Sequence, residues 1–517
     1  MAISCNGPLI HIASSANGPP TPCPLSTRSV MLAPIIVSVL GAWVDNPNSL
    51  SSSGSLFRAV RGRSYSGAQL FSSSEKVQAV TEQHAHAHAS ASSSECKQWA
   101  VTTTIFLPSK AVLQVDGLKD WCLVVVGDKR TPLPYNISGT FLSSDAQQSL
   151  PFDSQRLLRW NHFGRKNLGF LYAVQHGARW IYDFDDDNEL KSIGADAIPI
   201  PSLSATVEEP NTTHKVYNLY AQLSDRASSW PRGFPLPQIL EPATRSAAFV
   251  TRDWPARKVG IVQSLADHDP DVDGLFRLTQ PLPFSFPVDE LVGAPSLSRS
   301  AAVSAAGVGV SSAAHHQHSA HHQHSSSGSG TGSRLFAMPL GTMMPFNAQA
   351  TLFSHSALWS LLLPCTVHGR VTDIWRAYVA QRLLWDVGER LAFASPWVTQ
   401  YRNPHDYLGD FNSELPLYLQ SGELVDALRD WKPLRETLPG RLEELYILLY
   451  EFGVLELDDV TLVQAWITDL LRVGYKFPQL VSHGYTVAGA GKRPSEPSEG
   501  HATEPVDAAM FHAMLSP

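Results

Sequence analysis

The chain has 517 residues, of which 43% are hydrophobic and 13 are Trp, so it can bury a sizeable core and hold two or three domains. The formal net charge of −8 is mild and no block of Lys and Arg occurs, which argues against a nucleic-acid partner. The five cysteines are scattered without CxxC spacing, which argues against both a structural zinc module and a disulfide framework.

Three stretches of biased composition divide the chain. Residues 1–95, 290–333 and 485–517 are rich in small and polar residues and bury too little apolar surface to order themselves. We predict a disordered N-terminal tail or stem, a disordered insertion inside one domain and a disordered C-terminal tail. The N-terminal stretch contains an apolar run at 30–44, which Pro34 interrupts and which is shorter than the roughly 20 residues that span a bilayer. A signal anchor, a signal-peptide core and a buried segment all fit this run.

Two N-glycosylation sequons begin at Asn136 and Asn211. Such sites suit a domain in the lumen of the secretory pathway, although the pattern is also common by chance. The sequons favour a secretory location, with a membrane attachment if the run at 30–44 is an anchor.

The segment after the N-terminal tail alternates between strand and helix patterns. Residues 99–106 and 121–126 are β-branched apolar runs that end in turn residues, as expected for buried parallel strands. Apolar residues then recur at helical spacing between Asn161 and Gly177, and residues 180–184 return to a strand pattern. This alternation predicts an α/β fold.

Helical signals dominate the second half of the chain. One helix is predicted with Thr372 as its N-cap and Asp373 in its first turn. Residues 411–484 read as a further helical region. The remaining segments, 96–289 and 334–410, would be two halves of one α/β domain.

The stretch ARWIYDFDDDN runs from an apolar strand into a cluster of carboxylates. Neighbouring carboxylates repel and a strand end offers them little water, so the cluster is costly unless a cation lies among them. Hard divalent cations prefer carboxylate oxygens, so Asp185, Asp186 and Asp187 predict a Mg²⁺ or Mn²⁺ site for a diphosphate. Strand alternation would place Asp183 beside Asp185 and Asp187. An acidic surface turn is the alternative.

Polar residues follow all three predicted strands. Thr103 stands at the end of the first strand, Asp128 after the second and the acidic run after the third. Ligands of open α/β sheets bind outside the carboxyl ends of the strands. The three strand ends therefore predict one binding site.

The tetrapeptide Gly164-Arg165-Lys166-Asn167 lies where the helix before the acidic run begins. A helix N-terminus that carries two cations can bind an anion, and Arg165 could hold phosphate oxygens bidentately while Lys166 supplies a point charge. Two solvated cations on a surface turn are the alternative.

Six segments of the chain resemble the STELLO-type glycosyltransferases of plants, in the same order over about 97–410. These segments are WCLVVVGDKRTP, HFGRKNLGFLYAVQHGARWIYDFDDDN, SSWPRGFPL, DHDPDVDGLFRLT, GTMMPFNAQATLF and RVTDIWRAYVAQRLLW. The resemblance implies a GT-A-like fold in a Golgi type II membrane protein that is associated with cellulose synthase assembly and the cell wall. The triple Asp also gives a more distant likeness to reversibly glycosylated polypeptides, the UDP-arabinopyranose mutase family.

The resemblance implies roles for individual residues. Asp185–Asp187 would carry Mn²⁺ or Mg²⁺ and the diphosphate of a nucleotide diphosphate sugar donor. Asp128 would lie near the nucleotide, and Arg165 with Asn167 near the donor phosphates or sugar. Arg232 would be a further anion contact, with packing between two prolines as the alternative.

The resemblance also assigns the two halves of the domain. Residues 96–289 would bind the donor, and residues 334–410 would face a glycan or protein acceptor. Asp373 would be the general base that takes the acceptor proton, with an acidic first-turn residue favoured by the helix dipole as the alternative. Many GT-A sites complete the metal shell with a late histidine, whereas this chain has Gln400 there and His405 further on.

Three functions are compatible with these features. The first is a metal-dependent transferase that moves a sugar from the donor to a glycan or protein. The second is a non-catalytic factor with a degenerate site that assembles or traffics a polysaccharide synthase. The third is a nucleotide-sugar mutase, which would interconvert sugar rings without any acceptor.

Overall fold

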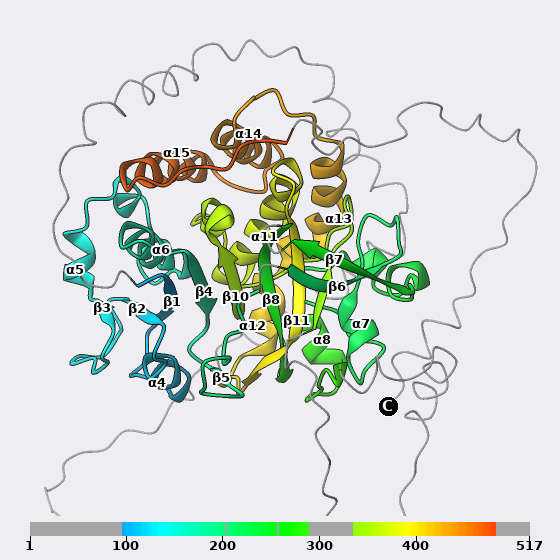
Figure 1. The fold of residues 1–517 in the computed structure, drawn as a ribbon, viewed down its shortest axis with the longest axis horizontal. Helices are drawn as coiled ribbons and strands as arrows, with labels where there is room; N and C mark the ends of the chain where they lie inside the picture. Colours follow the sequence, from blue (N-terminus) through cyan, green and yellow to red (C-terminus); the bar gives the residue numbers. More distant parts are fainter. Residues whose placement is uncertain (1–95, 202–203, 256–257, 289–333, 482–517) are drawn as a thin grey trace, which may run out of the picture. The chain divides into compact units, whose positions relative to one another are not determined.

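The computed structural model describes residues 96–201, 204–255, 258–288 and 334–481 (Figure 1). The three tracts of biased composition and the apolar run at 30–44 lie outside these residues. Within the described part, no helix combines the length and the apolar character needed to cross a bilayer.

The described strands form a single eleven-stranded sheet. They are β1 (Gln98–Thr104), β2 (Cys122–Gly127), β3 (Thr140–Leu142), β4 (Trp180–Phe184), β5 (Asn188–Leu190), β6 (Ser204–Pro210), β7 (Phe249–Pro255), β8 (Val259–His268), β9 (Leu335–Ala337), β10 (Ala350–Ser354) and β11 (Arg390–Gln400). Their order in the sheet is β3-β2-β1-β4-β10-β8-β11-β9-β6-β7, and β5 pairs with β11.

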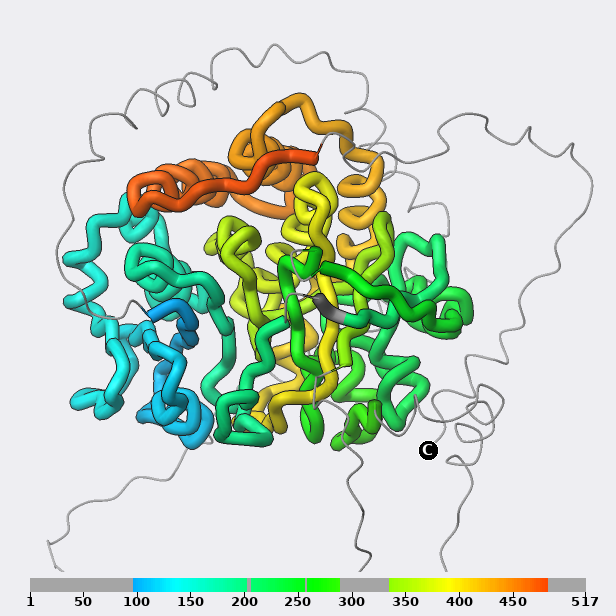
Figure 2. Tube along the Cα trace, viewed as in Figure 1, coloured from blue at the N-terminus to red at the C-terminus, as the bar shows by residue number. Residues whose placement is uncertain are grey.

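The pairing directions place several strand ends at one edge of the sheet. Strands β1 to β4 are parallel, β10 is antiparallel to both β4 and β8, and β8 is parallel to β11. Figure 2 shows β10 between β4 and β8, far from either in sequence. The carboxyl ends of β1, β2, β4, β8 and β11 therefore point the same way, and the segments before and after 289–333 build one sheet.

The described helices are α4 (Lys110–Asp116), α5 (Ser144–Gln148), α6 (Lys166–Gln175), α7 (Leu219–Leu223), α8 (Gly274–Thr279), α11 (Gly369–Asp386), α12 (Tyr407–Ser413), α13 (Leu415–Asp430), α14 (Leu438–Glu451) and α15 (Leu457–Arg472). The predicted α/β class is thus confirmed, and the sheet with its C-terminal helices is consistent with a glycosyltransferase fold.

Alternating strand residues serve the two faces of the sheet. Val124 and Val126 of β2 pack in the core cluster that contains α6, α11 and the C-terminal helices, whereas Leu123 and Val125 pack with α4 on the other face. Burial on both faces explains the continuous apolar runs of the parallel strands. Helices α13 and α14 pack on α11, and α15 packs on α14 (Figure 1). They share the core of the sheet and form no separate subdomain.

The start of α11 differs from the sequence prediction. His368 is the N-cap, and its side chain accepts a hydrogen bond from the Arg370 backbone N–H. Thr372 lies inside the helix and donates its hydroxyl to the Pro364 carbonyl at 2.6 Å. The predicted N-cap was wrong because the helix begins at Gly369, before Thr372, and its cap is a histidine, which is not among the residues preferred at N-caps.

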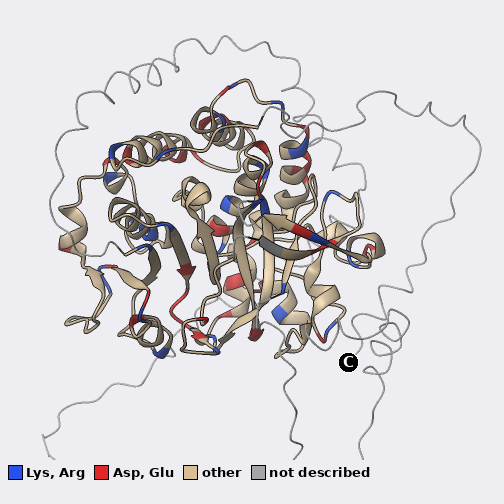
Figure 3. Ribbon diagram, viewed as in Figure 1, with Lys and Arg blue, Asp and Glu red and all other residues tan. Residues whose placement is uncertain are grey.

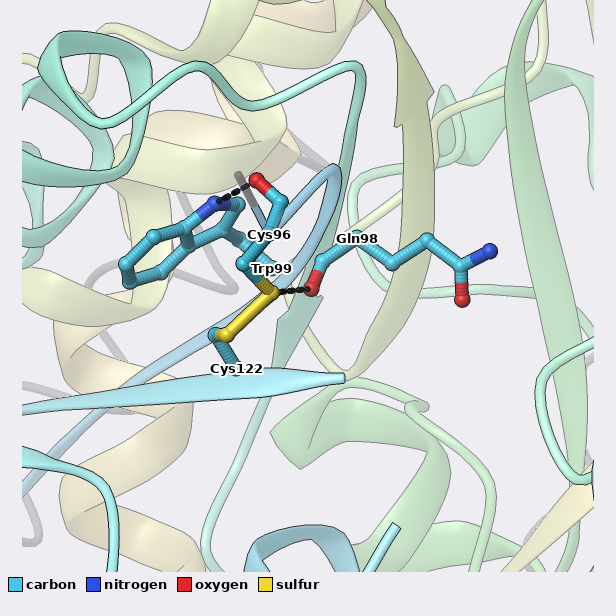
Figure 4. Close-up of a disulfide and its surroundings, with 4 residues drawn as sticks. All are labelled: Cys96, Gln98, Trp99 and Cys122. Carbon is cyan, nitrogen blue, oxygen red and sulfur yellow. Dashed lines mark hydrogen bonds between the residues drawn. A yellow bond between two sulfur atoms is a disulfide. The ribbon is translucent and has the colours of Figure 1, made fainter. Parts of the chain in front are cut away.

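A disulfide joins Cys96 to Cys122, whose Cα atoms are 6.4 Å apart (Figure 4). Cys122 pairs with Trp99 in the β1–β2 register, which brings Cys96 beside it, and the Trp99 indole donates to the Cys96 carbonyl at 2.9 Å. The spacing argument against a disulfide framework missed this bridge, because strand pairing brings together cysteines 26 positions apart. Cys365 is buried and free.

Candidate active site

A cavity of about 380 Å³ opens at the carboxyl ends of β1, β2 and β4, where the sequence predicted a binding site. Seven of the predicted site residues line it, from β1, the loops after β2 and β4, the segment before η3 (Leu236–Gln238), and α11. These are Thr103, Asp128, Asp185, Asp186, Asp187, Arg232 and Asp373. The fold therefore gathers most of the predicted site around one cavity.

The loop after β4 carries three successive aspartates to the cavity, visible as a run of acidic positions in Figure 3. Asp186 accepts a hydrogen bond from the Thr104 hydroxyl. Asp187 accepts from the Gln400 amide, with 3.3 Å to each carboxylate oxygen. One carboxylate oxygen of Asp185 is buried and accepts no hydrogen bond from the described residues.

The electrostatics of this loop favour a bound cation. Burial raises the pKa of Asp185 well above its usual value; Lys166 lowers it in part, and Asp187 raises it further. Burial also raises the pKa values of Asp186 and Asp187, against hydrogen bonds from Thr104 and Gln400 that lower them. A divalent cation would remove this cost by neutralising the charges, so the donor set fits Mg²⁺ or Mn²⁺.

In the described part of the chain, no group of three or more His, Cys, Asp or Glu side chains is arranged to hold a metal ion by itself. Mg²⁺ sites often use one or two carboxylates and take the remaining ligands from substrate phosphates and water. A cation at this loop would therefore need phosphate oxygens or water among its ligands.

Asp183 does not join the cluster. It is fully buried in β4, where one carboxylate oxygen lies 2.5 Å from the Lys166 amine and the other lies 2.7 Å from the Arg376 guanidinium. The predicted alternation fails because β4 ends at Phe184, and Asp185 to Asp187 lie in a turn.

The helix start at 165–167 faces the protein interior, which corrects the predicted phosphate contacts. Arg165 donates to the Gln147 amide oxygen from two nitrogens, at 2.8 and 2.5 Å, and lies 3.6 Å from the Trp160 ring centroid. Asn167 exchanges two hydrogen bonds of 2.9 Å with the Leu363 backbone. Neither side chain lines the cavity.

Lys166 contacts the end of β4 and the acidic loop but does not line the cavity. Its amine donates to the Phe184 carbonyl at 2.7 Å and forms an ion pair of 3.5 Å with the Asp185 oxygen that accepts no hydrogen bond. The reason for this inward orientation is the close packing of α6 on the sheet. A Cβ at Gly169 would lie 2.6 Å from Val101 and 2.7 Å from Val126, so only glycine permits this approach.

Asp128 faces the cavity from the end of β2. Its carboxylate accepts hydrogen bonds from two backbone N–H groups, those of Lys129 at 2.6 Å and Asn161 at 2.8 Å. Beside it, the Thr103 hydroxyl donates to the Val126 carbonyl at 2.8 Å. The two residues therefore place polar groups, held by hydrogen bonds, on one side of the cavity.

Arg232 joins two carboxylates across the cavity. Its guanidinium donates to Asp373 at 3.0 and 2.8 Å and to Asp271 at 3.0 Å for each oxygen. Both carboxylates raise the pKa of Arg232, against burial, so the side chain stays charged. Gly233 allows this placement, since its φ of +81° is left-handed and a Cβ there would lie 2.4 Å from Ile374.

Two further aspartates, Asp269 and Asp273, lie on either side of Asp271 in the segment 269–273 and have other partners. Asp269 pairs with Arg277 at 2.6 Å, and Asp273 is the N-cap of α8. Only Asp271 of this segment lines the cavity in the described structure. Asp373 lies in the second turn of α11, since the helix begins at Gly369, which removes the first-turn alternative for this residue.

Comparison with known proteins identifies relatives of the chain. A family model described as STELLO glycosyltransferases matches residues 370–500. The Arabidopsis thaliana protein named "Probable glycosyltransferase STELLO2" is 30% identical over 401 residues, which are 75% of this chain and 46% of that protein. "Probable glycosyltransferase STELLO1" of the same plant is 28% identical over 403 residues, with the same shares of the two chains. The chain is related to the STELLO glycosyltransferases. It spans about half the length of the relatives that it matches.

The segment matched to the STELLO family contains cavity residues that the sequence interpretation did not assign. Four of them are Arg370, at the start of α11, and Arg402, Asn403 and His405, in the segment after β11. Gln400, at the end of β11, lines the cavity as well. Gln349, outside the match, donates its amide to the Gln400 amide oxygen, and its carbonyl accepts from the Asp185 backbone N–H at 3.1 Å, so it joins the acidic loop to β11. The late position where a histidine was expected does face the site, with Gln400 in its place.

Proposed function

We propose that this STELLO-related chain is a metal-dependent glycosyltransferase that moves a sugar from a nucleotide diphosphate sugar to a glycan or protein acceptor. The observation that supports this function is the set of three half-buried aspartates with raised pKa values beside the carboxyl ends of the parallel strands β1, β2 and β4. The three aspartates share the cavity with the charged side chain of Arg232 and with a further carboxylate, that of Asp373.

The donor side of the site is built from β1, β2 and the acidic loop. Asp185 and Asp187 would hold Mn²⁺ or Mg²⁺ with phosphate oxygens of the donor, and Asp186 is fixed by Thr104. When bound, the cation neutralises charge on the leaving diphosphate. Asp128 and Thr103 offer polar groups to the nucleoside from the neighbouring strand ends.

The acceptor side contains the candidate base. Asp373 is 3% exposed, lines the cavity and is held by Arg232 in one orientation. In this proposal the acceptor hydroxyl approaches Asp373, which takes its proton as the hydroxyl oxygen attacks the anomeric carbon.

Calorimetric titration with UDP and with GDP, with and without Mn²⁺, tests the donor half of the proposal. We expect one of the two nucleotides to bind with micromolar affinity, and to bind at least about tenfold more weakly without Mn²⁺. Absence of binding by both nucleotides would favour the non-catalytic alternative. Ring interconversion of a nucleotide sugar without acceptor would favour a mutase.

We further propose that the domain works in an oxidising lumen, as a Golgi membrane protein would. The Cys96–Cys122 disulfide supports this location, because such bonds persist in secretory compartments, and the sequon residues Asn136 and Asn211 are both exposed.

Protein isolated from its native cells tests the location. We expect Cys96 and Cys122 to resist alkylation until a reductant is added, and peptide N-glycosidase to lower the apparent mass. Free thiols at both positions together with no change in mass would place the domain in a reducing compartment instead.

A further inference from the structure

Arg402 is a buried guanidinium with few partners in the wall of the cavity. Its side chain is 7% exposed, and the nearest carboxylate oxygen of an ion pair, on Asp410, is 3.7 Å away. Its Nε is buried and donates no hydrogen bond to the described residues. A buried cation in this condition is costly, so a ligand anion is the expected partner.

The other arginines around Arg402 are already neutralised. Arg370 lies 2.5 Å from Glu414 and 3.4 Å from Asp410, and Arg277 lies 2.6 Å from Asp269. Arg232 is shared by two aspartates, as described above. Of these four arginines, Arg402 therefore has the longest closest ion pair with a protein carboxylate.

The charged groups around Arg402 also leave its positive charge incompletely balanced. The pKa of Arg402 is lowered to about 10, chiefly by burial and also by the positive charges of Arg277 and Arg370. Asp271 and Asp410 oppose this shift only in part. An anion entering the cavity would gain from this uncompensated positive charge.

The position of Arg402 indicates which anion it meets. Arg402 lies two residues after Gln400, whose amide donates to Asp187, and all three residues line the same cavity. A divalent cation on Asp187 would repel Arg402 unless a negatively charged group lay between them. A donor phosphate beside Arg402 would supply that negative charge.

We propose that Arg402 binds the distal phosphate of the nucleoside diphosphate and neutralises the leaving group as its bond to the sugar breaks. This inference rests on the proposed function and names one phosphate of the same donor. Arg402 can hold phosphate oxygens bidentately, which its planar fork favours and which an amine could not reproduce.

Comparing di- and monophosphates in Arg402→Gln tests the inference. In the presence of Mn²⁺, we expect the Kd for the preferred nucleotide, UDP or GDP, to rise about 10- to 100-fold. The Kd for the matching monophosphate should change less than about twofold. Arg402→Lys should recover part of the loss, and Lys129→Gln, which removes an exposed cation outside the cavity lining, should leave the diphosphate-to-monophosphate ratio unchanged.

The thermal midpoint of the ligand-free variant gives an independent measurement. We expect Arg402→Gln to keep or raise it, since a buried and poorly compensated charge is removed. A lowered midpoint with an unchanged affinity ratio would identify Arg402 as structural and overturn the inference. Equal weakening of di- and monophosphate would overturn it as well. If neither diphosphate binds the unaltered chain with Mn²⁺, the proposed function itself is overturned, and with it the inference that depends on it.

Discussion

Asp185→Asn is expected to lower kcat/KM at least about 100-fold and to abolish the Mn²⁺ dependence of nucleoside diphosphate binding. Asp185 lines the cavity, and its buried carboxylate oxygen, 3.5 Å from the Lys166 amine, accepts no hydrogen bond from the described residues, so Asp185 is a candidate cation ligand. Neutralisation of a leaving diphosphate by a metal ion is worth several kcal/mol, and each 1.4 kcal/mol is a factor of ten in rate. Steady-state kinetics and calorimetry with Mn²⁺ measure both effects.

The same substitution should raise the stability of the metal-free protein. Burial and the neighbouring Asp187 and Asp183 disfavour the charged form of Asp185, and asparagine removes that charge without changing the size of the side chain. A higher thermal midpoint together with lost metal binding would separate a ligand role from misfolding. Asp196→Asn is the matched control, because Asp196 is exposed and lies outside the cavity lining. Unchanged Mn²⁺ dependence in Asp185→Asn would contradict the metal site.

Asp373→Asn is expected to lower kcat by about 100- to 10,000-fold while leaving the donor Kd unchanged. The carboxylate lines the cavity from α11, and Arg232 holds it in place with two hydrogen bonds. Asparagine fills the same space but cannot accept the acceptor proton. Single-turnover kinetics with saturating donor, alongside donor titration, measure the two quantities.

Asp271→Asn provides the matched control for this prediction. Asp271 lines the same cavity and pairs with the same guanidinium, at 2.8 Å, so it shares the positioning role of Asp373. If Asp373 acts as the base, its substitution should cost far more turnover than that of Asp271. Equal losses in the two variants would mean that both residues only position Arg232.

The sequence by itself determined the elements that carry the donor side. Runs of β-branched residues predicted β1, β2 and β4 to within about two residues, since strands buried on both faces need continuous apolar sequence. The acidic run after β4 predicted the site, because carboxylates that repel one another next to a buried strand end are costly unless a cation lies among them. Thr103, Asp128 and the three aspartates could be placed together on the rule for strand ends alone.

Only the tertiary structure decided which other side chains reach the cavity. Arg165 and Asn167 turn inward because Gly169 brings α6 onto the sheet, a contact between segments that local patterns do not encode. Arg402 and Asp271 come to the site through the pairing of β8 with β11 and the insertion of β10 between β4 and β8. Local hydrophobic periodicity depends on neighbouring residues, whereas pairing between distant strands depends on the whole core. For this reason the donor strands could be found in the sequence, and the counterions around Arg232 and Arg402 could not.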